Sequence, residues 1–466
     1  MDICVPSPVQ TYNTANGPGL LLVILASAHT NLKMIQASDS EPQILATPTS
    51  SISSRFPVEV WECILDFCAW NCEFTNDSHT LYACTLTCRA WLPRSRMHLY
   101  HMVNLYTEEN LRRFLSLVRQ NPIIGSLVYE LSLGPPIVRW KDLRRIEVEA
   151  ETSTQSQSSA LASVHSISRP EMACNWICLI PLYLLPLLPK LYTVRFRHLP
   201  YMNDATQKYL TRFRTNLNIR VLSASHGYFT SCRDLAWFAS CFPAVEQLRI
   251  GIVKFTVPSS TAPTFTYRSH PVFTHLHLWK SAESVLQTLL SWPSLEKIEH
   301  LSCDYVSRSD RSIAQFFLRV ISLQRLSIQL FNSAYPLPDK LNLTASAGLR
   351  ELKLFLMVRK GSERFLESLR LPSSLSFIAL ALQFDSSDCG DIVPSLGWEA
   401  LDVYLTKGFP LLKDLDVFIH EAPLTAEGRA RVYGFMAKTL PGLRGKGIGT
   451  VHYRTHKISD EISFWH

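Results

Sequence analysis

The chain has 466 residues, of which 47% are hydrophobic, 18% charged and 11% aromatic. This length predicts about three domains or one elongated array, and the apolar content excludes wholesale disorder. Glycine is scarce, at 17 residues against 27 prolines, which disfavours glycine-rich phosphate loops and nucleotide enzymes. The net charge of +7 is not gathered into a basic run, so nucleic acid is not expected as a partner.

The cysteines and the apolar runs indicate a compartment. The 12 cysteines have irregular spacings and no secretory signal accompanies them, which favours reduced thiols in cytoplasm or nucleus. Residues 19–28 are too few to span a bilayer, and residues 177–189 are interrupted by three prolines and read as a buried, kinked segment. We therefore expect no membrane partner.

Two stretches are expected to lack regular structure. Residues 1–54 mix Ser, Thr, Pro, Asn and Gln without a sustained period, which predicts a disordered leader. Residues 151–170 are rich in hydroxyl side chains, which form local hydrogen bonds in place of a helix or a sheet, and they predict a flexible insertion.

Residues 55–102 predict three short helices. Pro57 suits a first helical position, and an apolar stripe follows it. Asp77 or Ser78 can cap a second helix, and Pro93 separates that helix from a basic third piece at residues 94–101. A unit of this size cannot bury its apolar surface well by itself, which implies a partner.

This segment resembles an F-box in FPVEVWECILDF and LYACTLTCRAW, and the text that follows resembles F-box proteins of mushroom-forming (basidiomycete) fungi. The family's hallmarks are an apolar-Pro-x-Glu start, an Ile-Leu pair and a helix that ends in Cys-Arg-x-Trp. The loop at about residues 68–79 is longer than the family's usual connection, and Thr87 stands where an aliphatic residue is common. The matching positions are Phe56, Pro57, Glu59, Val60, Ile64, Leu65, Leu81, Cys84, Cys88, Arg89 and Trp91.

The resemblance implies a substrate-recognition adaptor of a Skp-cullin-F-box ubiquitin ligase, which is no enzyme and needs no cofactor. It implies docking on a Skp-type adaptor, through it on a cullin scaffold, and binding of an unknown protein substrate by the rest of the chain. The alternative to a ligase adaptor is a non-ligase repeat scaffold with a vestigial or assembly-only F-box. Residues of this segment can equally close its own three-helix core. The positions implied in adaptor binding are Phe56, Pro57, Val60, Ile64, Leu65, Leu81, Cys84, Cys88 and Trp91.

Residues 103–466 carry a recurring pattern of one apolar, two variable, one apolar, one variable and one apolar residue. Its commonest step is 26 to 28 residues, and each copy predicts a short strand. Segments at residues 232–242, 281–291 and 310–321 predict amphipathic helices, and pairs such as Phe409-Pro410 and Leu440-Pro441 predict helix ends. The middle apolar residues of the copies are Leu131, Val194, Leu248, Leu276, Leu326, Leu352, Ile378 and Leu415, with weaker copies at Leu222 and Ile298.

A strand and a helix repeated in about 27 residues predict an α/β fold, an irregular leucine-rich-repeat-like solenoid with a curved parallel sheet and outer helices. The Asn that normally follows the strand in such repeats is missing, and a two-layer α/β domain remains the alternative. The variable strand residues His275, His277, Trp279 and Lys280 are candidates for a binding face, or are ordinary solvated residues.

No enzyme motif competes with this interpretation. The cysteines around residues 63–88 lack the two-residue spacing of a zinc knuckle and are expected to pack as small apolar residues, so no metal is predicted. Gly445, Gly447 and Gly449 resemble a phosphate loop, but a strand-like segment follows them, so we predict a turn. No Gly-x-Ser-x-Gly or His-Glu-x-x-His motif occurs.

Overall fold

The computed structural model describes part of the chain. The predicted leader at 1–54 and the predicted insertion at 151–170 lie outside the described residues, so both stay predictions. The chain divides into two units, Met1–Trp61 and Glu62–His466, with the boundary inside the first described helix. The described residues are 57–75, 79–87, 89–134, 175–197, 209–225, 228–229, 231–255, 272–279, 283–290, 292–305, 310–330, 343–344, 346–358, 370–384, 396–420, 430, 434–435, 438–448 and 450–454.

Three helices stand where the sequence predicts them. They are α2 (Val58–Thr75), α3 (His79–Thr87) and α4 (Leu92–His101). Pro93 lies in the first turn of α4, where its missing amide hydrogen costs no helical hydrogen bond. The predicted caps Asp77 and Ser78 lie outside the described residues.

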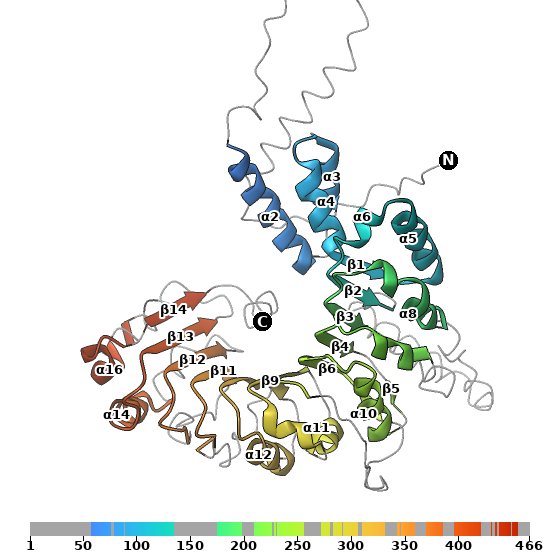
Figure 1. The fold of residues 1–466 in the computed structure, drawn as a ribbon. Coiled ribbons are helices and arrows are strands. Elements are labelled where there is room, and N and C mark those ends of the chain that lie inside the picture. Colours follow the sequence, from blue (N-terminus) through green and yellow to red (C-terminus); the bar gives the residue numbers. More distant parts are fainter. Residues whose placement is uncertain are drawn as a thin grey trace, which may run out of the picture. The chain divides into compact units, whose positions relative to one another are not determined.

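A parallel sheet of 12 strands follows (Figure 1), and its strands lie side by side almost in chain order. Every neighbouring pair is parallel, so each connection returns to the same end of the sheet. The strands are β1 (Met102–Leu105), β2 (Glu130–Leu133), β3 (Thr193–Phe196), β4 (Val221–Ser225), β6 (Gln247–Gly251), β8 (His275–Trp279), β9 (His300–Tyr305), β10 (Arg325–Leu330), β11 (Glu351–Val358), β12 (Phe377–Phe384), β13 (Asp414–His420) and β14 (Thr450–Arg454). A separate pair consists of β5 (Tyr228–Phe229) and β7 (Lys254–Phe255).

Helical segments connect the strands, and several carry the predicted apolar faces. The predicted helices at 232–242, 281–291 and 310–321 are confirmed as α10, α11 and α12, of which α10 and α12 are slightly shorter than expected. The segment at 177–189 is a series of short helical turns, as the prolines predict, but it is only partly buried, since Leu182 and Tyr183 are exposed. The bounds are α5 (Glu108–Gln120), α6 (Pro122–Gly125), η4 (Asn175–Leu179), α8 (Ile180–Tyr183), η5 (Leu185–Leu187), η6 (Thr211–Thr215), α10 (Cys232–Ser240), α11 (Glu283–Leu290), η8 (Pro293–Lys297), α12 (Asp310–Arg319), α14 (Trp398–Gly408) and α16 (Pro441–Gly445).

Both proline pairs mark helix ends, as predicted. The chain leaves α14 at Gly408, before Pro410, and the helical residues Gly434, Phe435 and Lys438 precede Leu440-Pro441, where the helix has ended. Pro441 also begins a further short helix, α16, which the sequence did not predict. Asp402 of α14 accepts hydrogen bonds from the backbone N–H groups of Gly442 and Leu443, at 2.8 and 3.0 Å. This contact caps a helix start after Pro441.

Two rows of apolar side chains on one face of the sheet form the core. Strand register places the middle residues of the predicted pattern opposite one another from Leu131 to Leu415, and those residues are buried. The exception is Ile298, which precedes β9, so that Leu301 takes the place in the row between Leu276 and Leu326. The backbone hydrogen bonds at the start of each strand also repeat from one unit to the next. Backbone N–H groups of His300 and Arg325 donate to the carbonyl oxygens of Thr274 and Glu299, one repeat earlier. The α/β class and the parallel sheet with helices are therefore confirmed, and they are compatible with a repeat solenoid.

Candidate functional site

Helix α2 has one buried and one exposed side. In its first turns Pro57, Val58 and Val60 are exposed. In the following turns Leu65 is 2% exposed whereas Phe67 is 54% exposed. Ile64, one helical turn before Phe67, is half-buried. The helix thus leaves large apolar side chains in contact with solvent.

Helix α3 repeats this arrangement on a smaller scale. Leu81 and Cys84 are buried, three residues apart, and form its inner side. Tyr82 and Leu86, four residues apart, are 58% and 70% exposed. Side chains at this spacing are neighbours on a helix surface, so α3 presents an apolar patch to solvent.

An ion-pair network connects α2 to α4. The Asp66 carboxylate accepts from Nε and Nη2 of Arg94, at 2.8 and 2.7 Å, and lies 2.7 Å from Nε2 of His98. The hydrogen bond from Arg94 lowers the pKa of Asp66 to about 2, despite some desolvation. The network fixes the two helices to each other, so the exposed side of α2 does not turn freely.

The residues implied in adaptor binding fall into three groups. Val60 is exposed, and Ile64 and Trp91 are half-buried. Leu65, Leu81 and Cys84 are buried in the helical unit, because they occupy the inner helix sides, and they offer little surface to a partner. Pro57 is exposed, whereas Phe56 and Cys88 lie outside the described residues.

The exposed residues Phe67, Tyr82 and Leu86 were not among the sequence candidates. A signal for them exists, since Val60, Ile64 and Phe67, and likewise Tyr82 and Leu86, follow helical spacing on the sides opposite the buried residues. The sequence alone does not say which of two apolar stripes a neighbouring helix covers.

The cysteines of this region behave mostly as small apolar residues. Cys68 and Cys84 are buried thiols, and burial raises the pKa of Cys68. Cys63 corrects the expectation, because it is exposed on α2. Within the described part of the chain, no three His, Cys, Asp or Glu side chains are grouped so as to hold a metal ion. Among the same residues, no helix is long and apolar enough to cross a membrane.

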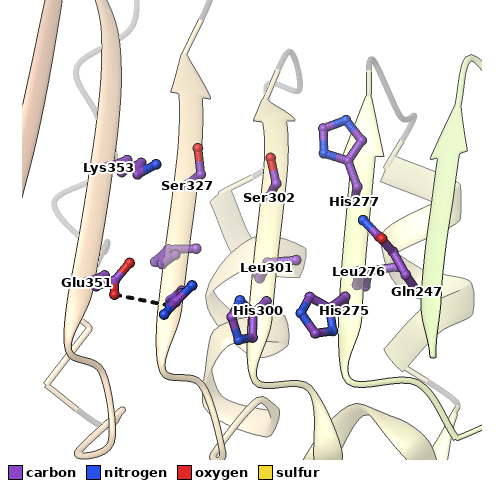
Figure 2. A pocket seen from close by; sticks show the side chains of 12 residues that line it. Gln247, His275, Leu276, His277, His300, Leu301, Ser302, Ser327, Glu351 and Lys353 are labelled. Atoms are coloured by element: carbon purple, nitrogen blue, oxygen red, sulfur yellow. Dashed lines mark ion pairs between the residues drawn. The ribbon is translucent and has the colours of Figure 1, made fainter. Parts of the chain in front are cut away.

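The other face of the sheet carries a polar hollow of about 190 Å³ (Figure 2). Its lining comes from five successive strands, β6, β8, β9, β10 and β11, and the helices lie behind them. Side chains of this face alternate with the buried leucines along each strand. The polar lining residues are Gln247, His275, His277, His300, Ser302, Arg325, Ser327, Glu351 and Lys353.

Two histidines and one ion pair set the electrostatics of the hollow. The rings of His275 and His300 stack with centroids 4.1 Å apart, and burial lowers the pKa of both. These imidazoles are therefore neutral at neutral pH. Arg325 pairs with Glu351 at 3.1 Å, which compensates its charge.

The candidates for a binding face lie partly where expected. His275 and His277 line the hollow, and His277 points outward in Figure 2. The ring of Trp279 lies against Gly251 of the neighbouring strand, where an added Cβ would be 2.8 Å from it. Lys280 lies outside the described residues.

Comparisons with known proteins leave the chain without an assigned family. No protein-family model matches it, and no curated protein does. A solved structure described as the crystal structure of Rad7 and Elc1 complex in yeast is 13% identical, covers 96% of this chain and 100% of its own, and has a TM-score of 0.33. A TM-score this low supports neither a shared fold nor a shared function.

Proposed function

We propose that this protein is the substrate-recognition subunit of a Skp-cullin-F-box ubiquitin ligase. Its helical unit α2–α4 is an F-box that docks on a Skp-type adaptor, and its repeats form an irregular leucine-rich-repeat-like solenoid that binds a protein substrate. The chain performs no covalent chemistry itself. It acts in the cytoplasm or nucleus by raising the effective concentration of a target lysine near the conjugating enzyme.

The observation that carries the proposal is the set of apolar side chains exposed to solvent on the surface of the helical unit. Phe67, Tyr82 and Leu86 are each more than half exposed, although all three are large apolar side chains. Isolated exposed apolar residues are ordinary, but an i, i+4 pair on one short helix favours a covering partner. Burial of such side chains contributes about 25 cal/mol per Å² of apolar area.

The F-box motif gives that surface a partner. Residues 58–67 of FPVEVWECILDF lie at the start of α2, and residues 81–87 of LYACTLTCRAW lie in α3, in the order that the family resemblance implies. A Skp-type adaptor buries the apolar side chains of an F-box, so the surface and the motif agree on one kind of partner. The 12-stranded sheet downstream supplies a separate surface for a substrate.

Co-purification tests this function. The full chain, expressed with a Skp-type adaptor and a cullin, is expected to copurify with both. Retention of the adaptor without the cullin would favour the non-ligase scaffold. Failure to retain the adaptor would overturn the proposal.

A further inference from the structure

The N-terminal part of the polar face holds more positive than negative charge. The strands β2, β3, β4 and β6 carry three charged residues, Glu130, Arg195 and Arg249, and Arg197 follows β3 directly. In-register pairing places Arg195, Ser223 and Arg249 on adjacent strands in one row. With a spacing of about 4.8 Å per strand, the two arginine Cα atoms are roughly 10 Å apart.

The single carboxylate is already engaged. Glu130 pairs with Arg195 through both oxygens, with Nη2 at 2.9 Å and Nε at 2.6 Å. The first of these contacts is a hydrogen bond, and the ion pair compensates the charge of Arg195. Arg197 instead donates to the neutral amide oxygen of Asn104 at 2.9 Å.

Arg249 is a partly buried cation beside a neutral amide. It is half-buried, and the amide oxygen of Gln247, in the orientation that satisfies both groups, lies 3.1 Å from its Nε and Nη2. Burial lowers the pKa of Arg249, the charge of Arg195 lowers it further, and Glu130 offsets this in part. A partly desolvated guanidinium beside a second one is stabilised by an added anion.

The residues around Arg249 suit an acidic ligand. Ser223, between the two arginines in the row, is small enough to leave room beside both guanidiniums, and its hydroxyl can donate to an oxyanion. Beyond Arg249 the same row continues through His277, Ser302, Ser327 and Lys353, with no carboxylate in it up to β11. These side chains line the hollow of Figure 2.

We propose that the surface of Arg195, Ser223 and Arg249 binds an acidic segment of a protein partner, with Arg249 pairing with an Asp or Glu carboxylate of that segment. This rests on the proposed function and names the chemistry of the substrate. Discrete carboxylates fit better than a nucleic acid backbone, because an unbroken row of phosphates would also meet Glu351 and Glu246 on the same sheet.

The test measures the fluorescence anisotropy of a labelled oligoglutamate peptide titrated with the full chain at low salt. Oligoglutamine and a single-stranded oligonucleotide serve as comparison probes. We expect oligoglutamate to bind more tightly than both, and to weaken as salt is added. Absence of oligoglutamate binding, or tighter binding of the oligonucleotide, would overturn the proposal.

Variants locate the binding. Arg249→Gln is expected to weaken oligoglutamate binding about tenfold, the loss of one charge-assisted hydrogen bond. Arg220→Gln is the matched control, because Arg220 precedes β4 and already pairs with Glu246 at 2.8 Å. Its effect is expected to stay below about twofold. Equal losses in the two variants would contradict a role of Arg249.

A second variant tests the same surface while leaving Arg249 in place, so that a folding defect of Arg249→Gln cannot decide the result. Ser223→Asp places a carboxylate of the chain itself between the guanidiniums, and is expected to weaken oligoglutamate binding without loss of the folded state. Unchanged binding in Ser223→Asp would argue against this surface. Adaptor binding, measured on the same proteins, should be unaffected by either variant, so failure here is distinct from failure of the ligase assignment.

Discussion

The helical unit α2–α4 and the parallel sheet differ in how completely they bury their apolar side chains. In the sheet, the leucines of successive strands are buried in continuous rows, and the outward residues of β6 to β10 are mostly polar. On β11 to β13 the outward residues Phe355, Ala381 and Phe418 form a small apolar cluster of their own. In the helical unit, Leu65 and Leu81 are buried while Phe67 and Leu86 stand in solvent. A repeat buries its apolar face against the next repeat, whereas three short helices lack a neighbour for their outer sides.

Because of this difference, we expect the helical unit and the polar face of the sheet to bind their partners through different interactions. A partner of the helical unit gains free energy from the burial of apolar area, and salt changes that contribution little. A partner of the polar face gains it from ion pairs, which salt weakens. Variants in each region test this contrast between an apolar and a charged binding surface.

Truncation of a buried leucine in the sheet should have the largest effect. Leu352→Ala removes a side chain that is 0% exposed between two neighbouring strands, and should lower the free energy of unfolding by about 2–5 kcal/mol. Lys353→Ala, on the next residue and the polar face, is the matched control and should change it by about 0.5 kcal/mol or less. Urea unfolding followed by circular dichroism measures both. Similar losses would contradict the one-sided core.

Removal of the Arg249 charge should leave the fold at least as stable. Arg249→Gln relieves a partly desolvated cation beside Arg195, so the free energy of unfolding should stay within about 1 kcal/mol of the unmodified protein or rise. The thermal midpoint of unfolding measures this. A fall of several degrees would mean that Arg249 holds the sheet together and is not kept for a ligand.

The Asp66 network should have the smallest effect, and a pH-dependent one. Because Arg94 lowers the pKa of Asp66 from 3.8 to about 2, the carboxylate stabilises the folded helices above about pH 4 and loses this contribution as the pH falls towards 2. Asp66 is 41% exposed, so the contribution is below about 1 kcal/mol.

Hydrogen exchange of α2 and α4 measures that contribution. Asp66→Asn should exchange faster than the unmodified protein at pH 7, and the difference should shrink as the pH falls through about 2, where half of the Asp66 carboxylates are protonated. Glu108→Gln, which breaks an exposed pair with Arg112 on α5, is the control and should leave α2 and α4 unchanged. A difference as large at pH 2 as at pH 7 would contradict the role of the carboxylate charge.

The sequence predicted the sheet well because its spacing reports directly on packing. Leucines at a step of about 27 residues can form rows only if their strands are parallel neighbours, and TVHYR was recognised as the last strand, β14. Strand β1 was missed, since MVNL directly follows a helix and has no complete copy of the pattern. The start of α16 was missed because it depends on Asp402, about 40 residues earlier.

The candidate surfaces were harder to predict, because they depend on contacts between residues that are distant in sequence. Spacing gives helix sides, but which side of α2 is covered depends on packing against segments distant in sequence, as the contact between Asp66 and Arg94, 28 residues apart, illustrates. The charge excess at Arg249 likewise depends on strand pairing that joins Glu130, Arg195 and Arg249 across more than a hundred residues. Neither arrangement is visible in local sequence.

A calorimetric titration of the full chain with a Skp-type adaptor tests most directly whether the exposed apolar side chains of the helical unit bind that adaptor. The double variant Phe67→Glu and Leu86→Glu puts charges into the apolar surface of the helical unit, and we expect it to lose at least about 2 kcal/mol of binding free energy. Leu318→Glu is the matched control, because Leu318 is 61% exposed on α12 of the repeats, and it should bind like the unmodified protein. Equal affinity of the double variant and the unmodified protein would contradict adaptor binding through this apolar surface.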